Sequence, residues 1–136
     1  METKPQKGCW VMGKEQRLKT AWIKKLPENV PRWEKVRLGE WHDKSKAKIA
    51  SVMLKYADLI YIQDNAMHIC EFKVRNQINA IGQLLTYKLE IIKTTELAPY
   101  YPLPIKLYLI VPFIDNVARM AAQRYGIEYE VFDGNS

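Results

Sequence analysis

Two apolar segments near the middle of the chain, residues 56–62 and 68–74, are separated by a short polar stretch. The first reads Tyr-Ala-Asp-Leu-Ile-Tyr-Ile and the second His-Ile-Cys-Glu-Phe-Lys-Val, and Asp64 and Asn65 lie between them. Segments rich in Ile, Tyr and Phe that are bounded by Asp and Asn are typical of strands joined by a tight turn. We therefore predict a β-hairpin with its turn at these two residues.

Three ionisable side chains interrupt the two predicted strands. Asp58 lies near the start of the first strand, and Glu71 and Lys73 lie near the end of the second. Because side chains alternate between the faces of a strand, Glu71 and Lys73 project from the same face. Antiparallel pairing brings the start of the first strand beside the end of the second, so Asp58 can reach the same place. The pattern predicts two carboxylates and one ammonium group at a single point of the sheet.

Such a group of side chains suits the hydrolysis of a phosphodiester bond. Carboxylate oxygens are the ligands that Mg²⁺ prefers, and Mg²⁺ is usually held by one or two carboxylates together with substrate phosphate. A bound metal ion activates water and neutralises charge on the phosphate, and Lys73 could orient that water and stabilise the transition state. The alternative is a salt bridge between Glu71 and Lys73 on a solvent-exposed edge strand.

A helix is predicted from Asn76 to Ile92. Its apolar residues recur at helical spacing and form one stripe, which consists of Ile78, Ile81, Leu85, Leu89 and Ile92. Gln83 and Tyr87 are one turn apart on a different face, about 140° to 180° from Ile78 at roughly 100° per residue. An amide and a phenol in this arrangement can hydrogen-bond phosphate oxygens or hold a nucleotide near a metal site. The alternative is that both side chains only decorate an exposed face.

The order and spacing of these residues resemble a known nuclease superfamily. The residues that carry the resemblance are, in chain order, Asp58, Glu71, Phe72, Lys73, Gln83 and Tyr87. They resemble the motif of the PD-(D/E)XK nuclease superfamily, and the similarity extends over residues 13–133. The Gln-x-x-x-Tyr helix is similar to the branch that includes the RecB nuclease domain, lambda exonuclease and the iron–sulfur nucleases of CRISPR adaptation.

Two departures from the family pattern are visible. Ala57 precedes Asp58, where the family name has Pro, and that position is loosely kept. The iron–sulfur members need four cysteines, whereas this chain has only Cys9 and Cys70. We therefore expect no iron–sulfur cluster.

The resemblance implies a fold and a division of roles. The fold is an α/β, restriction-endonuclease-like core in αβββαβ order, with a mixed central sheet flanked by helices. Asp58 and Glu71, with the main-chain carbonyl of Phe72, would bind Mg²⁺ or Mn²⁺, and Lys73 would complete the catalytic set. Gln83 and Tyr87 would hold the nucleic acid.

The resemblance also assigns a role to an acidic residue in the first helix. We predict that helix from Gly13 to Leu26, ended by Pro27. Many members of the superfamily carry a Glu there that faces the metal, and Glu15 matches that place. The alternative is that Glu15 lies at the frayed start of the helix, where an acidic side chain suits the helix dipole.

The rest of the pattern fits a single domain over residues 1–136. We expect strands at 33–38, 106–111 and 127–132, a helix to Tyr125 that is capped by Asp115 and stopped by Gly126, and a loop at 97–104. Residues 43–54 fit either a helix or a strand. We see no internal repeat and no linker, and we expect specificity to come from a homodimer or a larger assembly.

The composition and the length of the apolar runs bear on where in the cell we expect the protein to work. The longest apolar run, residues 107–114, is broken by Pro112 and is far shorter than the roughly 20 residues that a membrane span needs. The polar start of the chain lacks a signal peptide's apolar stretch, and two cysteines make no disulfide framework. We therefore expect a cytoplasmic protein that does not act in a membrane.

The positive charge lies in the first part of the chain. Residues 1–50 carry 13 Lys and Arg against 6 acids, a net charge of +7, whereas residues 51–136 carry 8 against 9. Lys44, Lys46 and Lys48 could follow a phosphate backbone, with Trp33 and Trp41 nearby to stack on unpaired bases. The alternative is an ordinary solvated basic face.

These observations lead to one preferred function and two alternatives. The preferred function is a metal-dependent deoxyribonuclease that binds DNA and acts on ends or single-stranded regions, with RNA as a further possible substrate. The first alternative is a structure-specific endonuclease similar to Holliday-junction resolvases. The second is a non-catalytic subunit with a nuclease fold that only binds nucleic acid.

Overall fold

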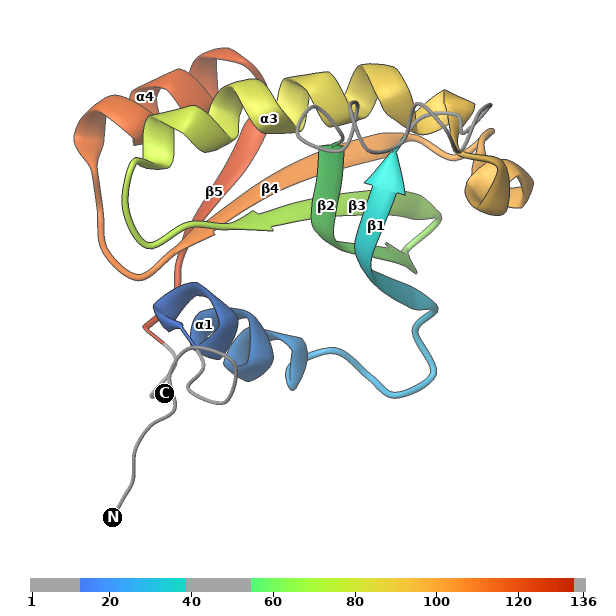
Figure 1. Ribbon diagram of the computed structural model, residues 1–136, viewed down its shortest axis with the longest axis horizontal. Coiled ribbons are helices and arrows are strands. Elements are labelled where there is room, and N and C mark those ends of the chain that lie inside the picture. The colour runs from blue at the N-terminus through green and yellow to red at the C-terminus, as the bar shows by residue number, and fades with distance from the viewer. Residues whose placement is uncertain (1–12, 39–54, 134–136) are drawn as a thin grey trace, which may run out of the picture.

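The computed structural model describes residues 13–38 and 55–133, which form a mixed five-stranded sheet between two helical layers (Figure 1). Strands β1 (Arg32–Leu38), β2 (Lys55–Gln63) and β3 (Ala66–Phe72) are antiparallel neighbours. Strands β4 (Ile105–Val111) and β5 (Ile127–Val131) continue the sheet in parallel with β3, in the order β1-β2-β3-β4-β5. The predicted element order and the mixed sheet are confirmed.

The two faces of the sheet are covered by different helices (Figure 1). Helices α3 (Gln77–Glu90) and α4 (Asn116–Arg124) pack side by side on one face, and α1 (Lys14–Ile23) lies on the other. The larger apolar core lies under α3 and α4, and the smaller core lies under α1, where Leu18 and Trp22 meet Phe72 and Ile110. The sheet therefore separates two hydrophobic cores.

The β2–β3 hairpin turns where the sequence predicts it. Leu59 pairs with Cys70 and Gln63 with Ala66, so Asp64 and Asn65 alone form the connection. Both turn residues have positive φ, 54° and 58°. This conformation is typical of the two-residue turns whose twist matches that of a hairpin, and Asn and Asp tolerate it well.

Helix α4 and the strand that follows it also match the prediction. The Asp115 side chain accepts hydrogen bonds from the backbone N–H groups of Val117 and Ala118, at 3.0 and 3.2 Å. Gly126 follows the helix at φ 72°, which glycine adopts without steric cost. The cap and the stop thereby set the length of the helix.

The orientation of α3 differs from the prediction. Its sheet-facing side is formed by Gln77, Ala80, Ile81, Leu84 and Tyr87, while Ile78 and Leu89 are exposed. The predicted aliphatic stripe is therefore rotated by roughly 100° from the face that the helix buries. The buried face combines Ile81 and Leu84 with Gln77, Ala80 and Tyr87, so a count of aliphatic residues alone predicts the wrong side of the helix.

Two other predicted segments need correction. The expected loop at 97–104 begins inside a 3₁₀ helix, η3 (Thr95–Tyr100), which follows the short 3₁₀ helix η2 (Ile91–Lys93). Leu97 in this segment is fully buried in the larger core, so the segment is part of the packed structure. Residues 43–54, for which helix and strand were both open, lie outside the described residues.

Candidate functional site

Asp58 and Glu71 meet where the hairpin strands β2 and β3 lie side by side. The paired register of the hairpin ends at Leu59 and Cys70, and Asp58 and Glu71 are the next residues on the two strands. The Oδ2 atom of Asp58 accepts a hydrogen bond from the backbone N–H of Phe72 at 3.0 Å, which ties the first carboxylate to the strand that carries the second. The predicted meeting of the two carboxyl groups is confirmed.

The regular alternation of side chains along β2 is interrupted at Asp58. Residues two apart on a regular strand share a face, yet Ala57 belongs to the core under α3 and Leu59 to the core under α1. Across from this point, Lys35 of β1 has a positive φ of 55°. The local distortion places a carboxylate at the boundary between the two cores, where neither core has to bury it completely.

Burial and mutual repulsion perturb the Glu71 carboxyl group. Glu71 is only 6% exposed. Loss of solvation, followed by the negative charge of Asp58, raises its pKa to about 8, against a smaller opposing effect from Lys73. Its Oε1 atom is buried and has no hydrogen-bond partner among the residues that the structure describes. A buried carboxyl oxygen without a partner is costly unless a cation or a donor reaches it.

Asp58 experiences a different balance of charges. Burial raises its pKa, while the Phe72 amide and the cations of Lys19 and Lys35 lower it. The negative charge of Glu15 adds a small effect in the raising direction. Asp58 therefore has more support for its ionised form than Glu71 has, because cations and a backbone donor surround it.

Tyr87 of α3 reaches the carboxylate pair from the side of the larger core. Its hydroxyl donates to the carbonyl oxygen of Tyr56 at 2.8 Å and lies close enough to the Glu71 carboxyl to lower the pKa of that group. Burial, together with the charges of Glu71 and Asp58, raises the pKa of Tyr87, so its hydroxyl keeps its proton. The possibility that this residue only decorates an exposed face is wrong.

Gln83 lies one turn before Tyr87 on the same helix and is half-buried. Its Oε1 atom is buried and lacks a hydrogen-bond partner within the described part of the chain. The residue is thus not a freely solvated surface amide, and the side of α3 that carries Gln83 and Tyr87 turns inward.

Lys73 directly follows β3 and remains near the pair. Its backbone N–H donates to the carbonyl of Ile110 at 3.1 Å, which continues the pairing with β4 beyond the last residue of β3. Its side chain is half-buried, and its charge acts on Glu71. The expected group of two carboxylates and one ammonium is therefore present at the end of β3.

Glu15 of the first helix joins the same region. Its Oε2 atom accepts a hydrogen bond from the backbone N–H of Val74 at 3.2 Å. Glu15 is exposed and lines a pocket of about 330 Å³ with Gly13, Lys14, Val74 and Arg75. Glu15 lies in the first turn of α1, as the helix-dipole alternative expects. Its proposed place at a metal stays a prediction, because among the described residues Glu15 is not grouped with Asp58 and Glu71 closely enough for three side chains to hold one ion.

Lys19 is a site residue that the sequence interpretation missed. It is 3% exposed, forms an ion pair with Glu34 at 3.3 Å, and acts on the carboxylate of Asp58. A buried lysine is rare unless it is paired. The available signal was its position one turn after Glu15, with Leu18 and Trp22 on the adjoining core face.

Only part of the predicted basic surface lies within the described residues. Lys44, Lys46 and Lys48, with Trp41, lie outside the described residues. Lys25 forms an ion pair with Glu130 at 2.7 Å and lies over the Trp22 ring. Trp33 is half-buried against Tyr100, with ring centroids 5.4 Å apart, and so is not a free stacking platform.

Asp58 and Glu71 offer carboxylate oxygens, the kind of ligand that Mg²⁺ prefers. Within residues 13–38 and 55–133, no three His, Cys, Asp or Glu side chains are grouped closely enough to hold a metal ion. Mg²⁺ is commonly held by one or two carboxylates and keeps several waters. Asp58, Glu71 and the main-chain carbonyl of Phe72 are the groups that could supply such ligands.

Solved structures share this architecture at low sequence identity. The chain is similar to EndoMS in its complex with double-stranded DNA, with a TM-score of 0.55 and 12% identity over 98% of this chain and 51% of that one. It is also similar to AF1548, a protein of unknown function, with a TM-score of 0.53 and 12% identity over 85% and 56% of the two chains. At this level of identity, the two likenesses show a shared α/β fold, a mixed five-stranded sheet flanked by helices.

A repair endonuclease from Pyrococcus abyssi aligns more loosely, with a TM-score of 0.44 and 15% identity over 71% of this chain and 50% of that one. The chain spans about half the length of each of these three solved structures. No family model matches the sequence, and no curated protein matches it. Within the described residues, no helix is both long and apolar enough to cross a membrane.

Proposed function

We propose that the chain is a metal-dependent nuclease of the PD-(D/E)XK type that hydrolyses phosphodiester bonds in DNA. Asp58, Glu71 and the carbonyl of Phe72 would hold Mg²⁺ or Mn²⁺. The observation that carries the proposal is the buried Glu71 carboxyl, which faces Asp58, has a raised pKa and leaves Oε1 without a partner. A divalent cation would relieve both the repulsion and the missing interaction.

The chemistry divides between the metal and the side chains of this chain. When bound, the metal would lower the pKa of water and neutralise charge on the phosphate. Lys73 would orient the attacking water and donate to the phosphate oxygens as their negative charge grows. Lys19, on the other side of Asp58, would hold that carboxylate ionised and oriented.

Tyr87 supports the site as a positioning residue. Because its proton is donated to the carbonyl of Tyr56, its hydroxyl is anchored beside Glu71 and limits the rotation of that carboxyl group. Gln83 retains a buried acceptor without a partner. In the preferred function, on DNA ends or single strands, this amide would contact the nucleotide beside the cleaved phosphate.

One observation favours the second candidate, a structure-specific endonuclease. The similar EndoMS structure is a complex with double-stranded DNA, and a nuclease that binds the interior of a duplex cuts it as an endonuclease. A structure-specific endonuclease would cut inside a duplex or at a junction. The two candidates use the same carboxylates and differ in the DNA that they accept.

Cleavage of defined substrates tests the proposal and separates the candidates. End-labelled linear, nicked, branched and covalently closed circular DNA would be incubated with Mg²⁺ and with Mn²⁺. We expect wild-type protein to degrade linear DNA faster than closed circles, and Glu71→Gln to remove cleavage in both metals. Glu28→Gln, at an exposed position in the turn after α1, is the matched control and should cleave normally.

A further substitution separates catalysis from binding. Lys73→Ala should abolish turnover while Mn²⁺ and DNA still bind, because Lys73 acts mainly on the transition state. Equal cleavage by wild type and Glu71→Gln would overturn the nuclease proposal. Metal-independent DNA binding without cleavage in the wild type would favour the non-catalytic subunit instead.

A further inference from the structure

Strand β5 is an edge strand whose outer side carries unpaired backbone groups in the described part of the chain. There it pairs with β4 alone. The N–H of Phe132 donates to the carbonyl of Val111 at 2.8 Å, so the backbone of Phe132 faces β4. Because successive residues of a strand turn their polar groups to opposite sides, Val131 and Tyr129 direct theirs outward. Such groups are a template for an additional strand.

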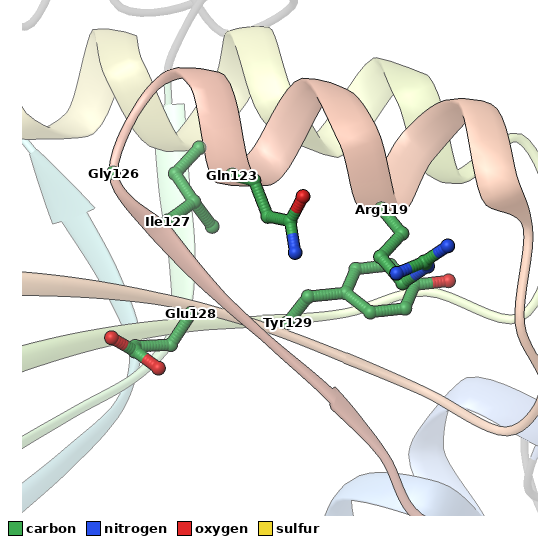
Figure 2. Close-up of a pocket in the computed structure, with 6 residues that line it drawn as sticks. All are labelled: Arg119, Gln123, Gly126, Ile127, Glu128 and Tyr129. Atoms are coloured by element: carbon green, nitrogen blue, oxygen red, sulfur yellow. The ribbon is translucent and has the colours of Figure 1, made fainter.

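A pocket of about 340 Å³ lies along this edge, between α4 and β5 (Figure 2). Arg119 and Gln123, one turn apart on α4, extend from the helix toward the strand, and Tyr129 rises from the strand on the same side (Figure 2). Glu128 projects from the opposite side of β5. The edge is therefore flanked by a guanidinium and an amide above the sheet and by a carboxylate below it.

Arg119 has an unused donor at this place. Its Nη2 atom donates to Oδ1 of Asn116 at 3.1 Å, whereas its Nε atom is buried and has no partner among the described residues. A guanidinium binds a carboxylate best through two adjacent N–H groups, one of which can be Nε–H. Rotation of the half-buried Arg119 side chain would bring this donor to an incoming carboxylate, which would then satisfy it.

We propose that the edge of β5 and the flank of α4 form a docking site for an extended peptide segment of a partner protein. The segment adds a strand to β5, places an acidic side chain over the sheet against Arg119, and places a basic side chain below it beside Glu128. Since successive side chains of a strand face opposite sides, the acidic and basic residues are adjacent in the peptide. This site is separate from the carboxylate pair and goes beyond the proposed nuclease activity.

Charge argues against a second copy of this chain as the occupant. Antiparallel pairing of two β5 strands centred on Tyr129 would set Glu128 of each copy opposite Glu130 of the other. Like charges directly opposite one another destabilise a strand pair. The Arg119 side chains of both copies would also lack a carboxylate partner. A partner strand with alternating acidic and basic residues would complement Arg119 and Glu128, whereas a second copy of β5 would not.

Two synthetic peptides of identical composition test the proposal. The probe is acetylated and amidated Val-Thr-Glu-Lys-Val-Thr, which places Glu and Lys on opposite faces. The comparison peptide is Val-Thr-Glu-Thr-Lys-Val, which places both charges on one face. Fluorescence anisotropy of the labelled peptides, up to about 1 mM protein, should show binding of the first at least about tenfold tighter than of the second. In backbone amide NMR spectra, the shifts should concentrate at Ile127, Tyr129 and Val131.

Protein variants connect the binding to the edge and to Arg119. Arg119→Gln should weaken binding of the first peptide at least about tenfold, because it removes the charge-assisted pair. Arg124→Gln, at an exposed position on the same helix and outside the pocket, should bind like wild type. Val131→Pro removes an outward N–H without disturbing the bond between Phe132 and Val111, and should also weaken binding. Thermal melts would show that each variant is folded.

Three results would overturn the proposal. They are equal affinity for both peptides, no binding at the highest protein concentration, and a wild-type dimer in sedimentation that Val131→Pro dissociates. None of them bears on cleavage of DNA, so the docking site and the nuclease activity can fail independently.

Discussion

The backbone N–H of Val74 donates to Oε2 of Glu15 at 3.2 Å, although the two residues are 59 positions apart in the chain. The bond joins the first turn of α1 to the residues that directly follow Glu71 and Lys73. The charge of Glu15 also acts on Asp58, in the direction opposite to that of Lys19. These two residues of α1 can therefore tune one carboxylate in opposite directions.

Substitution of Lys19 and of Glu15 should shift the pH dependence of cleavage in opposite directions. Lys19→Met removes a cation that lowers the pKa of Asp58, so the acid limb of the rate profile should move to higher pH. Glu15→Gln keeps an acceptor for Val74 but removes a charge that raises the same pKa, so that limb should move to lower pH. The measurement is the rate of cleavage against pH at saturating Mg²⁺.

Lys19→Arg is the control for this pair of variants because it keeps the positive charge. Its acid limb should remain close to that of wild type. A shift of the same sign in Lys19→Met and Glu15→Gln would mean that both act through the structure of α1 and not through the charge at Asp58.

The stability of the metal-free protein should fall as the pH rises toward 8. The pKa of Glu71 is raised from 4.5 to about 8 by burial and by Asp58, so between these values the folded state binds this proton more tightly than the unfolded state does. The free energy of unfolding is therefore greatest at the acidic end of this window. It falls with increasing pH by at most about 1.4 kcal/mol per unit for this group.

Urea denaturation at a series of pH values measures this effect. Glu71→Gln, which keeps the shape of the side chain without its charge, should flatten the slope, and saturating Mg²⁺ should flatten it in the wild type. The raised pKa of Asp58 contributes in the same direction, so a residual slope is expected in the variant. An identical slope in wild type and Glu71→Gln would contradict the assignment of the perturbed carboxyl.

Gln83 and Tyr87 should affect turnover more than folding. Tyr87→Phe keeps the ring and leaves the carbonyl of Tyr56 without its 2.8 Å donor, which should cost about 1 kcal/mol of stability. Combined with Gln83→Ala, it should reduce turnover on linear DNA at least about tenfold, equivalent to about 1.4 kcal/mol in the transition state. Single-turnover cleavage of end-labelled DNA gives the rate.

The same double variant distinguishes the two candidate substrates. Leu89→Gln, at an exposed position on the outer side of α3, serves as its control and should cleave like wild type. If the double variant cleaves linear DNA normally, or if wild type cuts closed junctions faster than it degrades ends, the structure-specific endonuclease is the better assignment.

The basic run in the first part of the chain should contribute phosphate contacts. Replacing Lys44, Lys46 and Lys48 with Gln should weaken DNA binding and reduce its salt dependence by roughly 0.7 to 0.9 log units per lost contact. Titrations of fluorescent DNA at several salt concentrations give this slope. An unchanged slope would show that the three lysines form only a solvated face.

Local patterns were sufficient to predict the carboxylate pair. Apolar strands, a two-residue turn and the alternation of side chains determine where Asp58 and Glu71 meet, because the register of a hairpin follows from its turn. The cap at Asp115 and the stop at Gly126 were equally accessible, since each depends on the chemistry of one residue. These features can be predicted without knowing which residues distant in the sequence come into contact.

Tertiary packing decides the features that the sequence did not reveal. Helix α3 buries Ala80 and Tyr87 against the sheet and leaves Leu89 exposed, which depends on how the helix packs and not on the spacing of its aliphatic residues. The position of Lys19 depends on contacts with Glu34 and Asp58, which are distant in the chain. A lysine in an amphipathic helix usually faces solvent, so its position one turn after Glu15 was not enough by itself to predict its burial.

The position of Asp58 depends on both hydrophobic cores, because β2 switches at this residue from one core to the other. Ala57 anchors the strand in the core under α3 and Leu59 anchors it in the core under α1, with the carboxylate of Asp58 between them. An opening of either core would release one anchor and separate Asp58 from the Phe72 amide. The Phe72 N–H should therefore exchange with solvent only when one of the cores opens, and a partly unfolded chain cannot retain an assembled carboxylate pair. Under the proposed nuclease function, cleavage would therefore require molecules in which both cores are folded.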